Sequence, residues 1–251
     1  MPTITYPQNV IWHKEIKPGY LLENFGLRHQ KRLRATQTKL STLNIFHTIQ
    51  LISNSFLDKF IPLYQDQINT KNNPRPQNIE KTLEKYKGVH SCYGLLLYQD
   101  NKLVGGALYI HKNNRITTAF KAFRASWYTK GLQASPTLYA EFLLYEHAIV
   151  HGYTLISHGQ DRNPYGIYSN IGLCSFKLSL GYNPIITNKT SILEINTETI
   201  NTTCLILRTP KKYHTVTEAD LFIHQNNLQA VESVTQYPTK LFVKIHILEE
   251  R

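Results

Sequence analysis

The sequence is poor in cysteine and has no long apolar run. Its 251 residues include 3 cysteines, and these form no C-x-x-C pair, so buried reduced thiols are expected rather than a disulfide framework. No apolar run approaches the roughly 18–20 residues that a membrane-spanning helix needs. Between Met1 and Gly19 there is no continuous apolar stretch typical of a secretory signal. We therefore expect a cytoplasmic protein.

Several catalytic motifs are also missing. The sequence has no G-x-S-x-G, no Walker loop and no G-x-G-x-x-G, so hydrolase, ATPase and dinucleotide-binding functions have no support. His147 and His151 could share one helix face because they are four positions apart. No third ligand with suitable spacing accompanies them, and we predict no metal site.

The composition favours a packed, basic protein. Hydrophobic residues make up 41% of the chain and aromatic residues 11%, which is ample for a core. Lys plus Arg number 28 against 17 Asp plus Glu, a formal net charge of +11. Such a charge attracts polyanions: coenzyme A, tRNA, an acidic peptide or an anionic membrane surface. The basic residues are dispersed apart from a group at His29–Arg34, so charge alone selects no partner.

Three β-rich runs in the middle of the chain predict an antiparallel meander. They are Cys92–Tyr98, Leu103–Ile110 and Ile116–Phe123. The short polar connections between them favour hairpins. Gly105 and Gly106, inside the second run, predict a bulge or the close approach of another group. Before the meander we expect helix-capable segments between residues 21 and 40, a helix from about 53 to 68 and a short one near 77–87.

A helix and a strand are predicted after the meander. Ser135 is a suitable N-cap and Pro136 suits the first helical position. Apolar residues then recur at helical spacing, and Glu141 is expected on the exposed face. Tyr153–Ser157 follows as a strand. A strand, a helix and a second strand imply a parallel crossover, so the fold class is α+β with a mixed sheet.

The next segment resembles part of a known superfamily. Residues 158–166 read HGQDRNPYG and residues 171–184 read IGLCSFKLSLGYNP. The second segment is similar to the G-L-x-x-F-K-x-x-x-G ending of GNAT branches related to the Fem-type aminoacyltransferases. The Gln99–Gly105 hairpin (QDNKLVG) also resembles the hairpin that joins the second and third strands of many GNAT proteins. The resemblance covers about residues 50–190.

The resemblance implies a GNAT-like fold in which an antiparallel meander, a parallel crossover and splayed central strands are combined. We expect one GNAT-like acyltransferase domain over residues 1–251. Within it, residues 1–50 would be an N-terminal extension and 51–190 the recognisable core. Residues 191–251 would supply C-terminal strands that complete the sheet. The sequence contains neither an internal repeat nor an evident domain linker.

The resemblance places a donor site at the start of the helix at Pro136. Its free N–H groups and positive end suit pyrophosphate. The residues that would assist are Lys130, Gly131, Gln133, Ser135 and Thr137. GNAT enzymes usually carry a Q/R-x-x-G-x-G/A loop here, but residues 126–135 read SWYTKGLQAS. The donor therefore stays open between acyl-CoA or acetyl-CoA, an acyl carrier protein and aminoacyl-tRNA. Simple capping by Ser135 is the alternative to phosphate binding.

The predicted catalytic residues follow the strand at Tyr153–Ser157. In a GNAT fold this strand and the one before it part and leave a wedge for the donor arm. We expect His158 to end the strand and act as general base, with Asp161 orienting its imidazole, because a pKa of about 6.5 suits that task. The alternative is that both residues only structure the loop.

Three further residues complete the predicted site. Tyr165 and Tyr168 are candidate proton donors to the leaving thiolate, a role that a tyrosine often has in this superfamily. As core or rim aromatic residues they would have no catalytic role. Lys177 belongs to the Phe-Lys part of the motif. It would contact donor phosphate or backbone carbonyl groups, unless it is a solvated helix residue.

We therefore predict N-acyl transfer from an acyl thioester to an amine of a small molecule or a peptide side chain. The alternative is aminoacyl transfer from charged tRNA, which the Fem-like ending and the charge favour. Fem-type enzymes, however, usually carry two tandem GNAT domains, and this chain has room for one. A third possibility is a non-catalytic GNAT-like module that binds RNA or an acidic partner.

Overall fold

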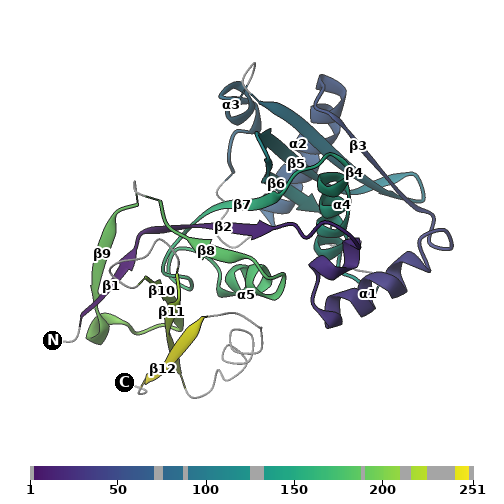
Figure 1. Cartoon of the computed structure of the whole chain (residues 1–251). Coiled ribbons are helices and arrows are strands. Elements are labelled where there is room, and N and C mark those ends of the chain that lie inside the picture. Colours follow the sequence, from purple (N-terminus) through teal and green to yellow (C-terminus); the bar gives the residue numbers. More distant parts are fainter. Residues whose placement is uncertain are drawn as a thin grey trace. The chain divides into compact units, whose positions relative to one another are not determined.

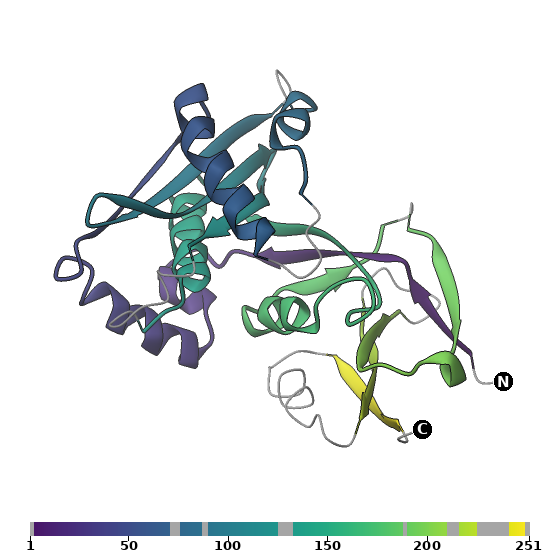
Figure 2. The same cartoon turned by 180° about the vertical axis from the view of Figure 1, so that it is seen from behind.

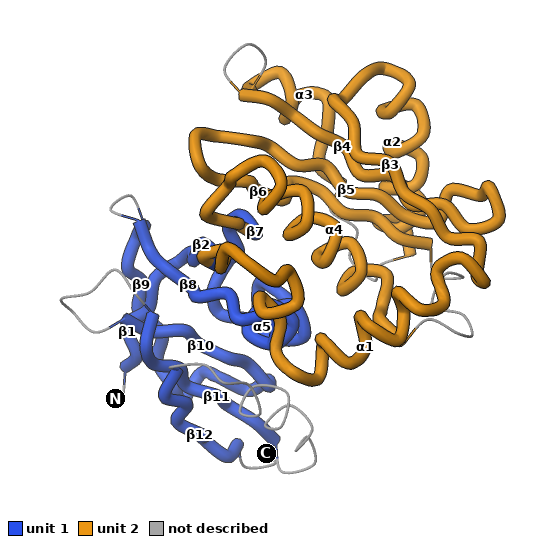
Figure 3. Tube along the Cα trace, turned by 45° about the vertical axis from the view of Figure 1, so that its right-hand side comes forward, with its two compact units in different colours: residues 1–14, 158–251 blue, residues 15–157 orange. Residues whose placement is uncertain are grey.

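The computed structural model describes residues 3–70, 76–86, 90–124, 133–187, 190–209, 216–224 and 241–248 (Figure 1). Its contacts divide the chain into two compact units, which Figure 3 distinguishes. Unit 1 comprises Met1–Lys14 and His158–Arg251, and unit 2 is Glu15–Ser157. Each helix in the described ranges is too short or too polar to cross a membrane.

Unit 2 is built on an antiparallel meander. Its strands pair in the order β3 (Ile45–Leu51), β4 (Ser91–Gln99), β5 (Lys102–Lys112) and β6 (Arg115–Phe123). The three predicted β-rich runs are confirmed as β4, β5 and β6. Strand β3 was not predicted, because most of its side chains are exposed and its apolar alternation is therefore weak.

The backbone pairing and the neighbouring atoms explain why β5 has two adjacent glycines. Leu97 pairs with Gly105 and the next residue of β4 pairs with Leu103, so the strand carries an extra residue at this point. A Cβ atom on Gly105 would lie 2.4 Å from the ring of Phe123, and one on Gly106 would lie 2.8 Å from a backbone oxygen. Both predicted reasons for these glycines, a bulge and a close approach, are confirmed.

Helices cover both faces of the meander. Unit 2 contains the 3-10 helix η1 (Leu21–Asn24) and the helices α1 (Leu27–Gln37), α2 (Asn54–Asn69), α3 (Ile79–Glu84) and α4 (Pro136–Val150). Figures 1 and 2 show α2 and α4 on opposite faces of the sheet. The Ser53 hydroxyl caps α2 by accepting a hydrogen bond from Phe56 N, so the expected helix start near residue 53 is confirmed.

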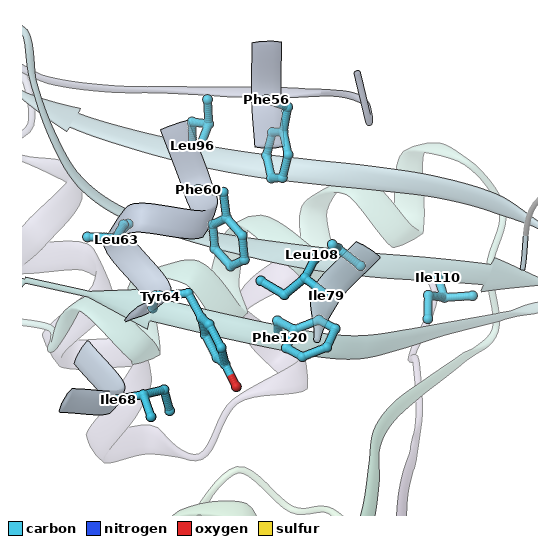
Figure 4. Packing of buried hydrophobic residues seen from close by; sticks show 11 residues of the cluster. Phe56, Phe60, Leu63, Tyr64, Ile68, Ile79, Leu96, Leu108, Ile110 and Phe120 are labelled. Carbon is cyan, nitrogen blue, oxygen red and sulfur yellow. The ribbon is translucent and has the colours of Figure 1, made fainter. Parts of the chain in front are cut away.

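Aromatic side chains of α2 fill the core of unit 2. The Phe56 and Phe60 rings stack with centroids 5.4 Å apart (Figure 4). Phe120 of β6 packs edge-on against Tyr64 of the same helix. Gly94 makes room for this packing, since a Cβ atom there would lie 2.0 Å from the Phe56 ring. Each fully buried phenylalanine contributes about 1.5–3 kcal/mol of apolar burial, which fixes α2 on the sheet.

Unit 1 contains α5 and several short sheets. Its elements are β1 (Thr3–Pro7), β2 (Asn9–Glu15), β7 (Leu155–Arg162), α5 (Ile171–Ser179), β8 (Asn183–Ile185), β9 (Ile192–Asn196), η3 (Thr197–Thr199), β10 (Cys204–Arg208), β11 (Glu218–His224) and β12 (Phe242–Leu248). The unit boundaries fall inside β2 and β7. The strand order of the largest sheet is β3-β4-β5-β6-β7-β2-β8.

Two expectations about the ends of the chain are wrong. The strands after residue 190 do not complete the largest sheet, because β9 pairs with β1 and β10–β12 form a sheet of their own. The N-terminal segment is more than an extension, since β2 lies between β7 and β8 in the strand order. Val10 and Trp12 are fully buried, which shows why this polar-looking segment forms a strand. The expected single domain stays a prediction.

Candidate functional site

Strand β6 bulges in its middle. Tyr109 of β5 lies opposite Thr118, whereas the adjacent Leu108 lies opposite Phe120. Ala119 is therefore an extra residue on β6. Such a bulge bends the strand and interrupts its pairing, and bulges are frequent beside active sites.

The edge of β6 that pairs with β7 loses this pairing close to the bulge. The parallel pairing of β6 with β7 begins at Arg115 and ends at the pair Thr117–Ser157. Among the described residues of unit 2, the stretch from Thr118 to Phe123 is therefore paired only with β5. The Thr118 hydroxyl is buried and has no hydrogen-bond partner in the described structure. The predicted parallel relation is confirmed, and the pairing stops one residue before His158.

A buried ion pair connects β6 with the helix that follows it. Lys121 Nζ lies 2.8 Å from Glu141 Oε1, and the Glu141 side chain is only 1% exposed. The expectation that Glu141 lies on an exposed helix face is wrong, because this face of α4 packs on the sheet. Burial, together with the Glu141 carboxylate, raises the pKa of Tyr109 well above its usual 10.0.

The start of α4 carries two of the predicted donor-binding residues. The Ser135 hydroxyl accepts a hydrogen bond of 3.2 Å from Leu138 N and so caps the helix. Thr137 lies half-buried in the first turn. Lys130 and Gly131 lie outside the described residues. Capping of α4 by Ser135 is thus observed, whereas phosphate binding stays a prediction.

The segment before α4 is held in place by α1. Arg32 Nε donates a hydrogen bond of 2.7 Å to the backbone oxygen of Gln133. The next residue, Ala134, donates its N–H to the Thr36 hydroxyl, also at 2.7 Å. Thr36 is fully buried. Helix α1 therefore positions the residues that lead into α4. No sequence pattern connects α1 with this site.

In unit 1 the structure brings together Asp161, Tyr165 and Lys177. Lys177 Nζ lies 2.6 Å from Asp161 Oδ2, and the two side chains are 3% and 10% exposed. The Tyr165 hydroxyl donates to the same oxygen at 2.8 Å. Trp12 Nε1 in turn donates to the Tyr165 oxygen at 2.9 Å. Lys177 is thus no solvated helix residue, and Asp161 is held by two donors.

Tyr165 keeps its proton in this environment. Burial raises the pKa of Tyr165 well above its usual 10.0, and Cys174 and the Asp161 carboxylate add to the rise. Burial likewise raises the pKa of the Cys174 thiol, which therefore stays protonated. No sequence pattern pointed to Trp12, apart from its being one of 2 tryptophans in the chain.

His158 contacts this buried group through its backbone, whereas Tyr168 is exposed. His158 does not end β7, as expected, but lies within it, because the strand continues to Arg162. Its ring packs edge-on against Tyr182 with centroids 4.4 Å apart, and its backbone oxygen lies 3.4 Å from Lys177 Nζ. Tyr168 is 46% exposed, and the Arg162 guanidinium lies 4.4 Å from its ring centre. The catalytic roles of His158, Asp161, Tyr165 and Tyr168 stay predictions.

Unit 2 also contains a cluster of histidine rings. His147 lies 5.3 Å from His111 and 4.1 Å from His151 between ring centres. His111 Nδ1 is 2.6 Å from the Tyr153 hydroxyl. Burial lowers the pKa of His111 and of His147 to about 4, and the neighbouring histidines contribute. Among the residues described, no group of three or more His, Cys, Asp or Glu is arranged to hold a metal ion.

The similarities to known proteins are structural. No family model matches the sequence, and no curated protein matches it significantly. FemX is similar with a TM-score of 0.52 and 12% identity, over 71% of this chain and 60% of that chain. L-PGS from Bacillus licheniformis is matched with a TM-score of 0.45 and 12% identity, over 70% of this chain and 53% of that chain. A GCN5-related N-acetyltransferase from Kribbella flavida is matched with a TM-score of 0.36 and 15% identity, over 76% and 58% of the two chains.

At this identity the likeness to FemX concerns the fold alone. It confirms the expected α+β fold with a mixed sheet, which is similar to the fold of FemX. The chain spans 60% of the FemX chain and 53% of the L-PGS chain. A shared fold does not identify the activity, the donor or the acceptor.

Proposed function

We propose that the protein is a GNAT-like transferase that moves an acyl group from a thioester to an amine. The observation that carries the proposal is the end of the β6–β7 pairing at Thr117–Ser157, next to the bulge at Ala119. Backbone groups of an unpaired strand edge bond an extended ligand as another strand would. The edge of β6 beyond Thr117 suits the amide groups of a pantetheine arm, and the unpartnered Thr118 hydroxyl adds a polar group there.

The phosphate end of the donor would bind at the start of α4. A helix N-terminus offers free N–H groups and a partial positive charge, and both favour pyrophosphate. Thr137 lies in this first turn, and Arg32 adds a cation where it holds Gln133. These features support acyl-CoA or acetyl-CoA as the donor. An acyl carrier protein would present the same pantetheine arm and phosphate.

Chemistry at the acceptor requires a neutral amine and a proton for the leaving thiolate. A positioned base adds roughly 10²–10⁴-fold in rate, and we assign this role to His158. Asp161, Tyr165 and Lys177 would position the strand and helix around it, since their contacts fix β7 to α5. Tyr168, which is exposed, is the better placed of the two tyrosines to give a proton to a departing group.

Donor binding is tested with coenzyme A and the variant Thr118→Val. Coenzyme A or acyl-CoA should raise the melting temperature of the wild-type protein by about 3 °C or more at saturation. Thr118→Val removes a hydroxyl without a partner, so the free protein should lose no stability while donor affinity falls about threefold to tenfold. Thr48→Val, on the exposed strand β3, is the matched control and should bind like wild type. Absence of any stabilisation by coenzyme A or acyl-CoA would reject the thioester donor.

His158→Ala separates binding from turnover. If His158 is the base, turnover should fall at least about a hundredfold while the dissociation constant of the donor stays within about twofold. Mass spectrometry of ligands that co-purify with the protein would identify the acyl group. Unchanged turnover in this variant would remove His158 from the mechanism.

The second candidate is aminoacyl transfer from charged tRNA. The net charge of +11 favours it, because contacts with phosphates release counterions and strengthen binding. Affinity for tRNA should then fall about tenfold or more between 50 and 200 mM salt. Binding of tRNA without stabilisation by coenzyme A would select this candidate over the first.

A further inference from the structure

Unit 2 contains a cavity on the side of α4 that faces α1. It has a volume of about 350 Å³ and lies among η1, α1 and α4. It is lined by Tyr20–Glu23, Gln30, Arg34, Gln37, Phe142 and Glu146. Small-molecule sites commonly have volumes of about 300–1,000 Å³, so a compact ligand fits this cavity.

The walls of this cavity are fixed by buried contacts. The Asn24 side chain is 3% exposed and accepts a hydrogen bond of 2.8 Å from Lys17 N, which holds η1. Gln30 Nε2 donates to the Phe25 backbone oxygen at 2.8 Å and so joins α1 to the end of η1. The Phe25 ring packs against Tyr145 of α4 with centroids 4.9 Å apart. A site with such walls is formed before its ligand arrives, which lowers the entropy cost of binding.

Three charged residues from three elements line the cavity. Glu23 comes from η1, Arg34 from α1 and Glu146 from α4. None of them takes part in an ion pair with another residue that the structure describes. Phe142 and Leu22 add apolar surface beside them. All three residues are exposed, so a ligand in the cavity would replace water around two carboxylates and one guanidinium.

We propose that this cavity binds a small dibasic amino acid or a close analogue. Two cationic groups would pair with Glu23 and Glu146, and one carboxylate would pair with the planar Arg34 guanidinium. The carbon chain of the ligand would lie against Phe142, whose ring also attracts a cation. A purely cationic or a purely zwitterionic molecule satisfies only part of this set of charges.

Three probes of similar carbon skeleton separate these possibilities. L-ornithine carries all three charges, putrescine lacks the carboxylate, and L-norvaline lacks the side-chain amine. Isothermal titration calorimetry of the full chain at low salt should give a saturable dissociation constant on the order of 0.1–1 mM for ornithine. Putrescine and norvaline should each bind about tenfold more weakly. Equal affinity for all three probes, or no saturable binding of ornithine, would overturn the proposal.

Two variants assign the contacts to residues. Glu146→Gln should weaken ornithine and putrescine about tenfold, and Arg34→Gln should weaken ornithine about tenfold but leave putrescine within about twofold. Glu84→Gln on α3 and Arg28→Gln on α1 are matched controls, because neither residue lines the cavity. Both controls should bind ornithine like wild type. If Glu146→Gln binds ornithine as tightly as wild type, the ligand lies elsewhere and the proposal is refuted. The same conclusion follows if the two control variants weaken ornithine binding as much as Glu146→Gln does.

Discussion

Each unit has a buried ion pair that joins a strand to the next helix, but the strand supplies the cation in unit 2 and the anion in unit 1. In unit 2 the strand β6 supplies the cation Lys121 and the following helix α4 supplies Glu141. In unit 1 the strand β7 supplies the anion Asp161 and the following helix α5 supplies Lys177. Each pair fastens a strand to the helix that comes after it in the chain.

The two pairs differ in their access to water. Lys121 is 19% exposed and its partner Glu141 1% exposed, whereas Lys177 is 3% exposed and its partner Asp161 10% exposed. Asp161 also accepts a hydrogen bond from Tyr165, which is fully buried. Water can reach the position of Lys121 and solvate part of the carboxylate left behind, whereas the position of Lys177 is closed to water, so the unpaired Asp161 charge is the more costly one. The comparison predicts a larger penalty in unit 1.

The largest effect is expected from Lys177→Met. The substitution leaves Asp161 buried with a tyrosine as its remaining donor, so the free energy of unfolding should fall by about 3–5 kcal/mol. Denaturation by urea, followed by circular dichroism, measures the loss. Adding Asp161→Asn should restore a large part of it, because the stranded charge is then gone. Lys81→Met on α3 is the control. A loss in unfolding free energy below about 1 kcal/mol for Lys177→Met would contradict the larger penalty expected in unit 1.

Acidification should destabilise unit 2 through its histidine cluster. The pKa values of His111 and His147 are about 4 in the folded state, whereas an unfolded histidine has a pKa of about 6.5. Their contribution is therefore complete above about pH 6.5, declines as the pH falls towards 4, and is absent below it. Because the neighbouring histidines oppose one another's protonation, the two losses are not additive, and we expect a loss of about 3 kcal/mol for the two together.

The control for this titration is a histidine outside the cluster. Urea denaturation between pH 7 and 4 should show a smaller pH-dependent loss in His147→Gln, because one of the two protonations no longer opposes folding. His224→Gln, in unit 1, removes a histidine outside the cluster and is the matched variant. Equal slopes for all three proteins would contradict the role of the cluster.

An intermediate effect is expected from Tyr165→Phe. The ring stays in place, but Asp161 loses one donor and Trp12 Nε1 loses its acceptor. A hydrogen bond to a charged group contributes about 1.5–3 kcal/mol, so the free energy of unfolding should fall by about 2–3 kcal/mol. Tyr168→Phe is the natural control, because Tyr168 is exposed and should change stability by less than about 0.5 kcal/mol.

The smallest effect is expected from Lys121→Met. Water can reach the position of the lost ammonium group, because this side chain is 19% exposed, and can solvate part of the Glu141 carboxylate. We expect a loss of about 1–2 kcal/mol in the urea experiment. A loss as large as that of Lys177→Met would show that exposure does not distinguish the two pairs.

The fold could be predicted where the sequence repeats a simple pattern. The three runs of the meander and the helix at Ser135–Pro136 carry local signals, namely polar turns, an N-cap and helical spacing. Strands β1 and β2 carry no comparable signal, since both are short and their partners come from the other end of the chain. Pairing over such a distance is invisible to a local pattern.

The site could be predicted only as a set of residue types. The motif around Lys177 and the neighbouring Asp161 and Tyr165 selected three residues that the structure brings into contact. It could not select Trp12, which joins them from a strand at the opposite end of the sequence. The helical spacing after Ser135 also gave the wrong face for Glu141, because a helix that is buried nearly all round has no polar stripe.

The chain order of the two units has a consequence for biosynthesis. Unit 2 is one continuous segment, whereas unit 1 is assembled from residues on either side of it. Trp12 and Tyr165, which share a hydrogen bond, are 153 positions apart. A ribosome makes the N-terminal strands first, yet their partners emerge only after the whole of unit 2. Strand β2 is therefore synthesised before its partner strand β8 and stays without it until the whole of unit 2 has been made.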